Sequence, residues 1–248
     1  GLVQELKREN KKLNILKRLS LDNKQLALEQ QSQVLINNMM LDGQADHDKE
    51  IAKLKQVNNE LVMLSANVIA MYSKEPPGHS LRVAQQAKAL ATRLNLASPI
   101  NVYFAALYYR IGIASLADNL LSQPWYKLNL KEQNSYSKFA HSSADVMSSL
   151  QLLKQSAEIV GKLFDYRNEV DDISDIVNDP LLTSAMALRL VIEFDLLVSG
   201  VTTGEPMSPD KAFSICEQQV GVLYDKNTFK FFVNMYLKPN KGETIQCA

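Results

Sequence analysis

The sequence is poor in cysteine and has no long uncharged apolar run. Its two cysteines are Cys216 and Cys247, and neither belongs to a CxxC pattern or lies next to a histidine. They are too few for a disulfide framework in a chain of this size, so we expect a reducing compartment, the cytoplasm. No stretch approaches the roughly 18 to 20 consecutive apolar residues that span a bilayer, and we expect no membrane partner.

The chain also lacks an excess of charge of either sign and the common nucleotide and hydrolase motifs. Lys plus Arg and Asp plus Glu both count 27. The basic residues between Lys7 and Arg18 are interrupted by Glu9, which is typical of a solvated helix face, so we expect no nucleic-acid partner. GxGxxG, P-loop and GxSxG patterns are absent. The composition therefore predicts a soluble, folded protein that has none of these common active-site motifs.

The first 73 residues favour helix. Residues 2–41 contain neither Gly nor Pro, and we expect one long helix there, followed by a turn at residues 41–48 (LDGQADHD). A second helix is expected from about Lys49 to Ser73, with apolar residues spaced alternately by three and four: Leu54, Val57, Leu61, Leu64, Val68 and Met71. This seam predicts either pairing with a second chain in a coiled coil, which makes a homodimer, or packing on the first helix as a hairpin.

The remainder predicts a compact all-α bundle. After the Pro-Pro-Gly break at residues 76–78, one apolar face runs through residues 83–94 and another through residues 102–109, and Asn129 with Glu132 forms a capping box. No segment alternates as a strand should. Further helices are expected over residues 157–164, 183–199, 208–220 and 225–237.

Two segments carry the most specific pattern. They are EPPGH at residues 75–79 and AALYYRIGI at residues 105–113, the latter followed by SLAD at residues 115–118. From Glu75 onward the order of features resembles the HD-GYP family, bacterial metal-dependent phosphohydrolases that cleave cyclic di-GMP and often follow a receiver domain and a helical linker. The family's Glu-Thr-Gly-x-His falls on residues 75–79 and its Ala-Ala-x-Leu-His-Asp-Ile-Gly-Lys on residues 105–113.

The departures from the family pattern fall on its ligands. By the resemblance, Tyr109 stands where a metal-binding His belongs, Arg110 where the bridging Asp belongs, and Ile113 where a substrate-facing Lys belongs. The family's His-His-Glu falls on residues 163–165 (LFD), and its Gly-Tyr-Pro signature is absent. His141 matches a further ligand His. Asp195 matches one of the two Asp residues in Asp-x-Tyr-Asp-Ala-Leu, either the metal ligand or its structural neighbour.

A two-metal phosphodiesterase site needs enough carboxylates and imidazoles to hold two cations about 3.5 to 4 Å apart. The candidates that remain are Glu75, His79, His141 and, if it matches the ligand position, Asp195. We therefore expect no catalytic residue and no cofactor; if a metal binds, it is one Fe, Mn or Zn ion on Glu75, His79 and His141. The alternative is that both histidines are core or capping residues. Arg110 is expected to pair with Glu75 or Asp195 and to supply charge in place of a metal.

The combined prediction is a catalytically inactive HD-GYP-like output domain at residues 74–248 behind a dimerising helical linker at residues 1–73. The chain opens inside a helical pattern, and we expect it to derive from a bacterial response regulator that signals through dimerisation and protein contacts. Two alternatives stay open. One is a metal-dependent phosphohydrolase that cleaves cyclic di-GMP at a divergent site, and the other is a module that senses a nucleotide without cutting it.

Overall fold

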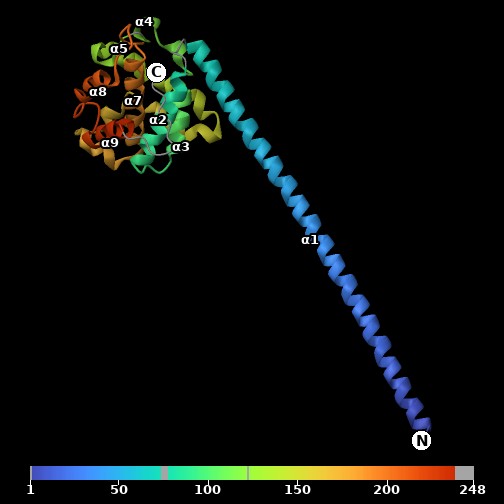
Figure 1. The fold of residues 1–248 in the computed structure, drawn as a ribbon. Helices are drawn as coiled ribbons and strands as arrows, with labels where there is room; N and C mark the ends of the chain where they lie inside the picture. Colours follow the sequence, from blue (N-terminus) through green and yellow to red (C-terminus); the bar gives the residue numbers. More distant parts are fainter. Residues whose placement is uncertain (1, 74–77, 122, 238–248) are drawn as a thin grey trace. The chain divides into compact units, whose positions relative to one another are not determined.

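The structure is a computed structural model that describes residues 2–73, 78–121 and 123–237, and it divides into two units, residues 1–62 and 63–248 (Figure 1). All regular elements within the described residues are helices, and one isolated bridge joins Val220 to Tyr224. The all-α prediction is confirmed for this part of the chain. The predicted domain boundary between residues 73 and 74 stays a prediction.

Helix α1 spans Leu2–Ser73, so the predicted turn at residues 41–48 and the predicted helical hairpin are not formed. The helix passes without a break through residues 41–48. A single Gly43 costs only about 1 kcal/mol relative to Ala in a helix, and no Pro is present to remove a hydrogen bond. Lys49 and Asp46 also form an ion pair at 3.2 Å on this segment. The hairpin alternative is therefore wrong, whereas pairing of the seam with another chain stays a prediction.

The seam residues are exposed in each unit taken by itself. In residues 1–62, the exposed fractions are 63% for Leu54, 42% for Val57 and 58% for Leu61. In residues 63–248, Leu64 and Val68 are similarly exposed, while Ala66 and Ile69 on the same helix are buried. The end of α1 therefore has one face in the core of the second unit and apolar residues outside that core.

The second unit consists of short helices whose positions follow the sequence prediction. Val83, Ala87, Leu90 and Ala91 are buried on α2, as the predicted apolar face required. The longer helices are α2 (His79–Arg93), α3 (Pro99–Tyr108), α5 (Leu130–Ser148), α6 (Lys154–Gly161), α7 (Pro180–Val198), α8 (Pro209–Glu217) and α9 (Lys226–Leu237). Short α4 (Asp118–Leu121) and several 3-10 turns connect them, including η2 (Trp125–Lys127). The predicted helices after the Pro-Pro-Gly break are thus confirmed.

The predicted caps are present. The Asn129 side chain accepts a hydrogen bond from the Glu132 amide at 3.1 Å, and the Glu132 carboxylate accepts one from the Asn129 amide at 2.9 Å. Ser208 caps α8, with Pro209 as its first residue. Asp179, which the sequence analysis did not single out, caps α7 through bonds from two amides. These bonds satisfy amides that the first helical turn leaves free.

Helix α7 forms the centre of this unit. It is apolar around most of its circumference, and all but a few of its residues are buried. A helix that is hydrophobic on all sides must be covered on all sides, and α7 packs against α2, α6 and α8. The polar residues Arg189 and Asp195 on this helix are therefore held in the interior, whereas Glu193 is partly exposed.

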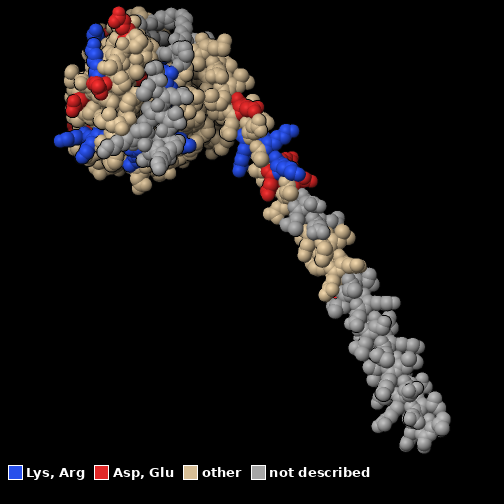
Figure 2. Space-filling model, in the orientation of Figure 1, with Lys and Arg blue, Asp and Glu red and all other residues tan. Residues whose placement is uncertain are grey.

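Two features of the described residues concern the surface and membrane contact. On the face drawn in Figure 2, basic and acidic side chains are interspersed among uncharged residues. No helix in the described part of the chain is long and apolar enough to cross a membrane. Cys216 is buried, and Cys247 lies outside the described residues.

Candidate functional site

His79 is the first residue of α2 and is completely buried. It follows Gly78, whose φ of +71° is a backbone conformation that glycine adopts without strain. The turn places the imidazole in the interior against α7. The Nδ1 atom of His79 lies 2.6 Å from Oδ2 of Asp195, and its Nε2 atom lies 2.7 Å from the Tyr109 hydroxyl. Both nitrogens are thus engaged within the protein.

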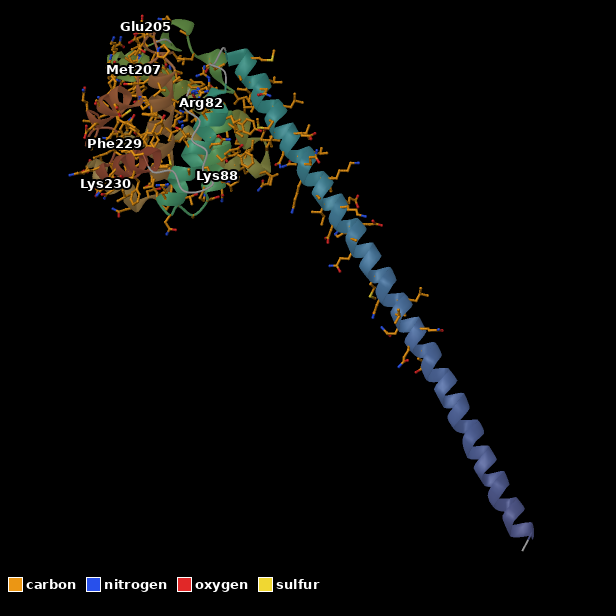
Figure 3. The ribbon with its side chains drawn as sticks, in the orientation of Figure 1. Arg82, Lys88, Glu205, Met207, Phe229 and Lys230 are labelled. Carbon is orange, nitrogen blue, oxygen red and sulfur yellow. The ribbon has the colours of Figure 1, made fainter. Side chains whose placement is uncertain are left out.

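Asp195 is buried with 4% of its side chain exposed, and Arg82 lies one turn into α2 (Figure 3). Arg82 donates to both carboxylate oxygens, from Nε to Oδ1 at 2.8 Å and from a terminal nitrogen to Oδ2 at 3.0 Å. Burial alone would raise the pKa of Asp195, but the hydrogen bonds from His79 and Arg82 more than offset it, so the pKa is lowered. Asp195 is therefore an ionised, internally neutralised carboxylate.

The bond to the ionised Asp195 carboxylate determines which nitrogen of the His79 ring donates to it. A carboxylate only accepts hydrogen bonds, so Nδ1 carries a proton and donates it. In the neutral ring Nε2 then accepts from the Tyr109 hydroxyl. Tyr109 is 2% exposed and occupies the position that the HD-GYP resemblance assigns to a metal-binding His. The Tyr109 hydroxyl is thus bonded to Nε2 of His79, the nitrogen that a metal ion would need.

Arg110 is also buried, and its guanidinium carbon lies 5.9 Å from the centre of the Tyr109 ring. The hydrogen bonds to Asp195 come from Arg82 and His79, so Arg110 is not the residue that neutralises this carboxylate. The expected partner Glu75 lies outside the described residues. Arg110 nonetheless adds a fixed positive charge beside Tyr109, since a guanidinium keeps its proton in proteins.

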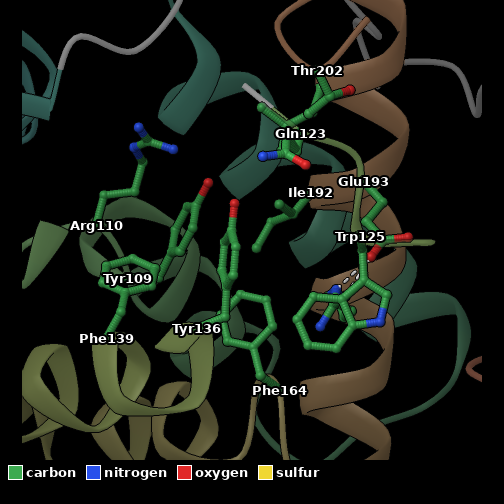
Figure 4. Close-up of a pocket in the computed structure, with 12 residues that line it drawn as sticks. Tyr109, Arg110, Gln123, Trp125, Tyr136, Phe139, Phe164, Ile192, Glu193 and Thr202 are labelled. Atoms are coloured by element: carbon green, nitrogen blue, oxygen red, sulfur yellow. Dashed lines mark hydrogen bonds and ion pairs between the residues drawn. The ribbon is translucent and has the colours of Figure 1, made fainter. Parts of the chain in front are cut away.

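A small cavity lies beside this cluster. It has a volume of about 40 Å³ and is lined in part by Tyr109, Arg110, Trp125 and Tyr136. Figure 4 shows Tyr109 and Tyr136 between Arg110 on one side and Trp125 and Glu193 on the other. Burial raises the pKa of Tyr136 to about 12, so its hydroxyl stays protonated. One water needs roughly 10 to 15 Å³ of such volume, so the cavity holds only a few waters.

A second buried polar group was missed by the sequence analysis. Arg189 donates to Oε1 of Glu193 from Nε at 2.7 Å and from a terminal nitrogen at 2.5 Å. The Tyr224 hydroxyl donates to the other oxygen of Glu193 at 2.5 Å. An Arg and a Glu four residues apart on a predicted helix were the available signal, because such residues lie on one helix face.

His141 lies in a different setting, with 58% of its side chain exposed. Its Nδ1 atom lies 2.7 Å from the Ser137 carbonyl oxygen, one turn earlier on α5, and 3.7 Å from Asp165. His141, Asp165 and polar residues of α5 line an open surface hollow of about 450 Å³. His141 is thus part of this hollow and is not among the residues that line the cavity beside Tyr109.

The described residues do not fit the metal that the resemblance implies. His79 has no nitrogen left for a metal, Asp195 is bonded by Arg82, and Tyr109 and Arg110 occupy two ligand positions. Within residues 2–73, 78–121 and 123–237, no group of three or more His, Cys, Asp or Glu side chains is placed to hold an ion. The proposed ligand Glu75 falls outside these ranges.

Comparison with known proteins identifies the fold of the second unit. The sequence model of the HD domain family matches residues 63–228, which include the end of α1 and every element from α2 to α8. No curated protein matches the chain closely enough to count as a relative. HD domains have a phosphohydrolase-type helical fold. Because the match covers more than half of the residues, the chain belongs to the HD domain family.

Proposed function

We propose that this HD domain is a catalytically inactive, HD-GYP-like signalling domain that acts through dimerisation and contacts with a partner protein. The observation that carries the proposal is the engagement of both His79 nitrogens by Asp195 and Tyr109. An imidazole whose two nitrogens are bonded inside the core binds no metal, and hydrolysis of a phosphodiester by this family's chemistry needs metal-bound hydroxide.

The size of the cavity argues against the nucleotide-sensing alternative. Ligand pockets typically have about 300 to 1,000 Å³, whereas the cavity beside Tyr109 has about 40 Å³. A cyclic dinucleotide would require displacement of the Trp125 and Tyr136 side chains. Calorimetry with cyclic di-GMP is expected to give no binding heat, and a saturable signal would favour a sensing module instead.

Loss of catalysis is tested by incubating the protein with cyclic di-GMP and with p-nitrophenyl phosphate in Mn²⁺, Fe²⁺ or Zn²⁺. We expect no turnover above a denatured control. The variant Tyr109→Phe is assayed beside the wild-type chain. It removes the hydroxyl that is bonded to Nε2 of His79 and leaves the aromatic ring in place. Metal-dependent turnover by the unmodified protein would contradict the proposal that the domain is inactive and would support the divergent phosphohydrolase instead.

The dimer part of the proposal rests on the seam. Apolar residues at alternating spacings of three and four are typical of a coiled coil, and the seam residues of α1 are exposed in each unit. In the proposed mechanism, the chain is the output region of a bacterial response regulator, and a signal changes the pairing of these helices and thereby presents or hides a surface of the HD domain.

Dimerisation is tested by light scattering on the full chain. Leu54→Glu with Leu61→Glu is expected to give a monomer, because charges in the seam cannot be buried unpaired. Asn59→Glu, an exposed position outside the seam, is the matched control and should leave the dimer intact. A monomeric wild-type protein, or a dimer that survives both seam charges, would remove the linker role.

A further inference from the structure

The side chain of Arg189 is 2% exposed and lies against two aromatic rings. Its guanidinium carbon is 4.0 Å from the centre of the Trp125 ring and 4.4 Å from that of Phe164. The two rings are themselves stacked, with centres 5.4 Å apart and planes at 21°. A cation over desolvated aromatic faces is a favourable arrangement that holds the guanidinium in one position.

The charge of Arg189 is balanced inside the protein. Glu193 accepts two hydrogen bonds from the guanidinium, and Tyr224 donates to the remaining carboxylate oxygen. Burial alone would lower the pKa of Arg189, but the charge and hydrogen bond of Glu193 together with Tyr224 and Tyr166 more than offset burial, so the pKa is raised and the group stays charged. Arg189, Glu193 and Tyr224 therefore form one ion network, in which Arg189 and Tyr224 are buried and 17% of the Glu193 side chain is exposed.

The Arg189 network lies at the cavity beside Tyr109. Arg189 and Glu193 line the same small cavity as Tyr109, Arg110 and Phe164. Those three residues fall on positions that the HD-GYP resemblance assigns to the metal ligands and the His-His-Glu motif. The guanidinium fills part of the space that a metal ion would need, and both oxygens of Glu193 already accept hydrogen bonds from Arg189 and Tyr224.

We propose that Arg189 is a built-in cation that takes the place of a metal ion in this cleft, with Trp125 as its cover. The inference rests on the proposed loss of catalysis and extends it to the folding of the domain. A metal in a folded domain links the elements that supply its ligands. Arg189 links α7 to Phe164 after α6 and to Trp125 before α5 without an ion.

The connector that carries Trp125 contacts the rest of the unit through this ring, through buried Leu128 and through a hydrogen bond from the Gln133 side chain to the Leu128 carbonyl. The backbone bonds of residues 127 and 128 go to Pro124 and Trp125, within the connector itself. The Trp125 ring also meets the edge of Tyr136, with centres 5.7 Å apart. Because Trp125 is the single tryptophan of the chain, its fluorescence reports this site alone.

The test compares Arg189→Met, Glu193→Gln and the double variant with the wild-type chain, with Lys154→Met as an exposed control. We expect Arg189→Met to lower Tm by about 6 to 20 °C, because it leaves Glu193 without its partner. The double variant should recover part of the loss, since a pair removed together leaves no orphaned charge. Trp125 emission should move to longer wavelength in Arg189→Met as water enters beside the indole.

Each result decides the inference. EDTA and Mn²⁺ are expected to leave the wild-type Tm unchanged. A Tm within about 2 °C of wild type in Arg189→Met, or a wild-type Tm lowered by EDTA, would overturn it. If Arg189→Met does not fold, Glu193→Gln keeps the guanidinium and should still lower Tm, and no loss there counts against the network. Turnover of cyclic di-GMP would instead contradict the proposed function, while the Tm series still judges Arg189.

Discussion

His79 and His141 both fall on ligand positions of the HD-GYP pattern, yet the structure gives them opposite surroundings. His79 is fully buried, with one nitrogen on Asp195 and the other on Tyr109. His141 is 58% exposed and makes one bond to the helix turn before it, at Ser137. One of these two positions therefore lies in the core, and the other lies at the surface.

The difference shows which of the two histidines the core of the domain depends on. A buried imidazole must keep hydrogen-bonding partners, because an unsatisfied buried polar group costs about 1 to 3 kcal/mol. Tyr109 and Asp195 meet that requirement at His79. At His141 the ring is 58% exposed, so solvent can reach it and no buried partner is required. We therefore expect His79 to contribute to the stability of the domain and His141 to contribute little.

The largest expected contrast is at the carboxylates near the two histidines. Asp195→Ala should lower the free energy of unfolding by about 3 to 5 kcal/mol, because it leaves Arg82 and His79 without their buried partner. Asp165→Ala, beside His141, is the matched change and should cost less than about 1 kcal/mol. Urea titration of both variants gives the comparison. Equal losses would show that the His79 cluster has no special role in the core.

The histidines themselves come next. His79→Ala should cost about 2 to 4 kcal/mol, because it opens a cavity and leaves Tyr109 and Asp195 without a partner. His141→Ala should stay within about 0.5 kcal/mol of wild type, as exposed substitutions usually do. Thermal unfolding followed by circular dichroism measures both. A strongly destabilised His141→Ala would contradict the surface assignment.

A smaller effect is expected from the phenol on His79. Tyr109→Phe removes one hydrogen bond and should cost about 1 to 3 kcal/mol, because Nε2 of His79 then lacks a buried partner. Tyr126→Phe, at a tyrosine that is 46% exposed, is the control and should be nearly neutral. Guanidinium titration separates the two. If both variants match wild type, the Tyr109 bond contributes nothing to the core.

The contribution of Asp195 to the free energy of unfolding is expected to depend on pH in the acid range and to be constant near neutrality. The pKa of Asp195 is lowered in the folded chain despite its burial, through bonds from His79 and Arg82. Its stabilising contribution is therefore complete above the unfolded pKa of about 4 and is lost as the pH falls below that value. Wild-type stability should drop more steeply below pH 4 than that of Asp195→Asn. Parallel acid curves would argue against an ionised Asp195 in the core.

The sequence predicted the fold further than the site. Helix positions followed from apolar spacing and from caps such as Asn129, because those signals are local. The turn near Gly43 was a wrong prediction, since one glycine in a long breaker-free segment costs less than the helix gains. The partners of Asp195 could not be predicted, because Arg82 lies far from it in sequence and the family pattern directed attention to Arg110.

The Arg189 network had a local signal that was not used. Arg189 and Glu193 are four residues apart on a segment correctly predicted as a helix, but that spacing is usual for exposed pairs. Only the position of α7 at the centre of the unit buries Arg189 of this pair. Its aromatic partners, Trp125 and Phe164, come from distant connectors, and no spacing rule joins them to Arg189.

The central claim is that this HD domain has replaced its metal site with bonds between protein side chains. Elemental analysis of the full chain, purified without chelator and dialysed after exposure to Mn²⁺, Fe²⁺ and Zn²⁺, tests it most directly. The account predicts well under one metal ion per chain in a folded protein. One or two tightly held ions per chain, lost in His79→Ala but kept in the Lys154→Met control, would contradict it.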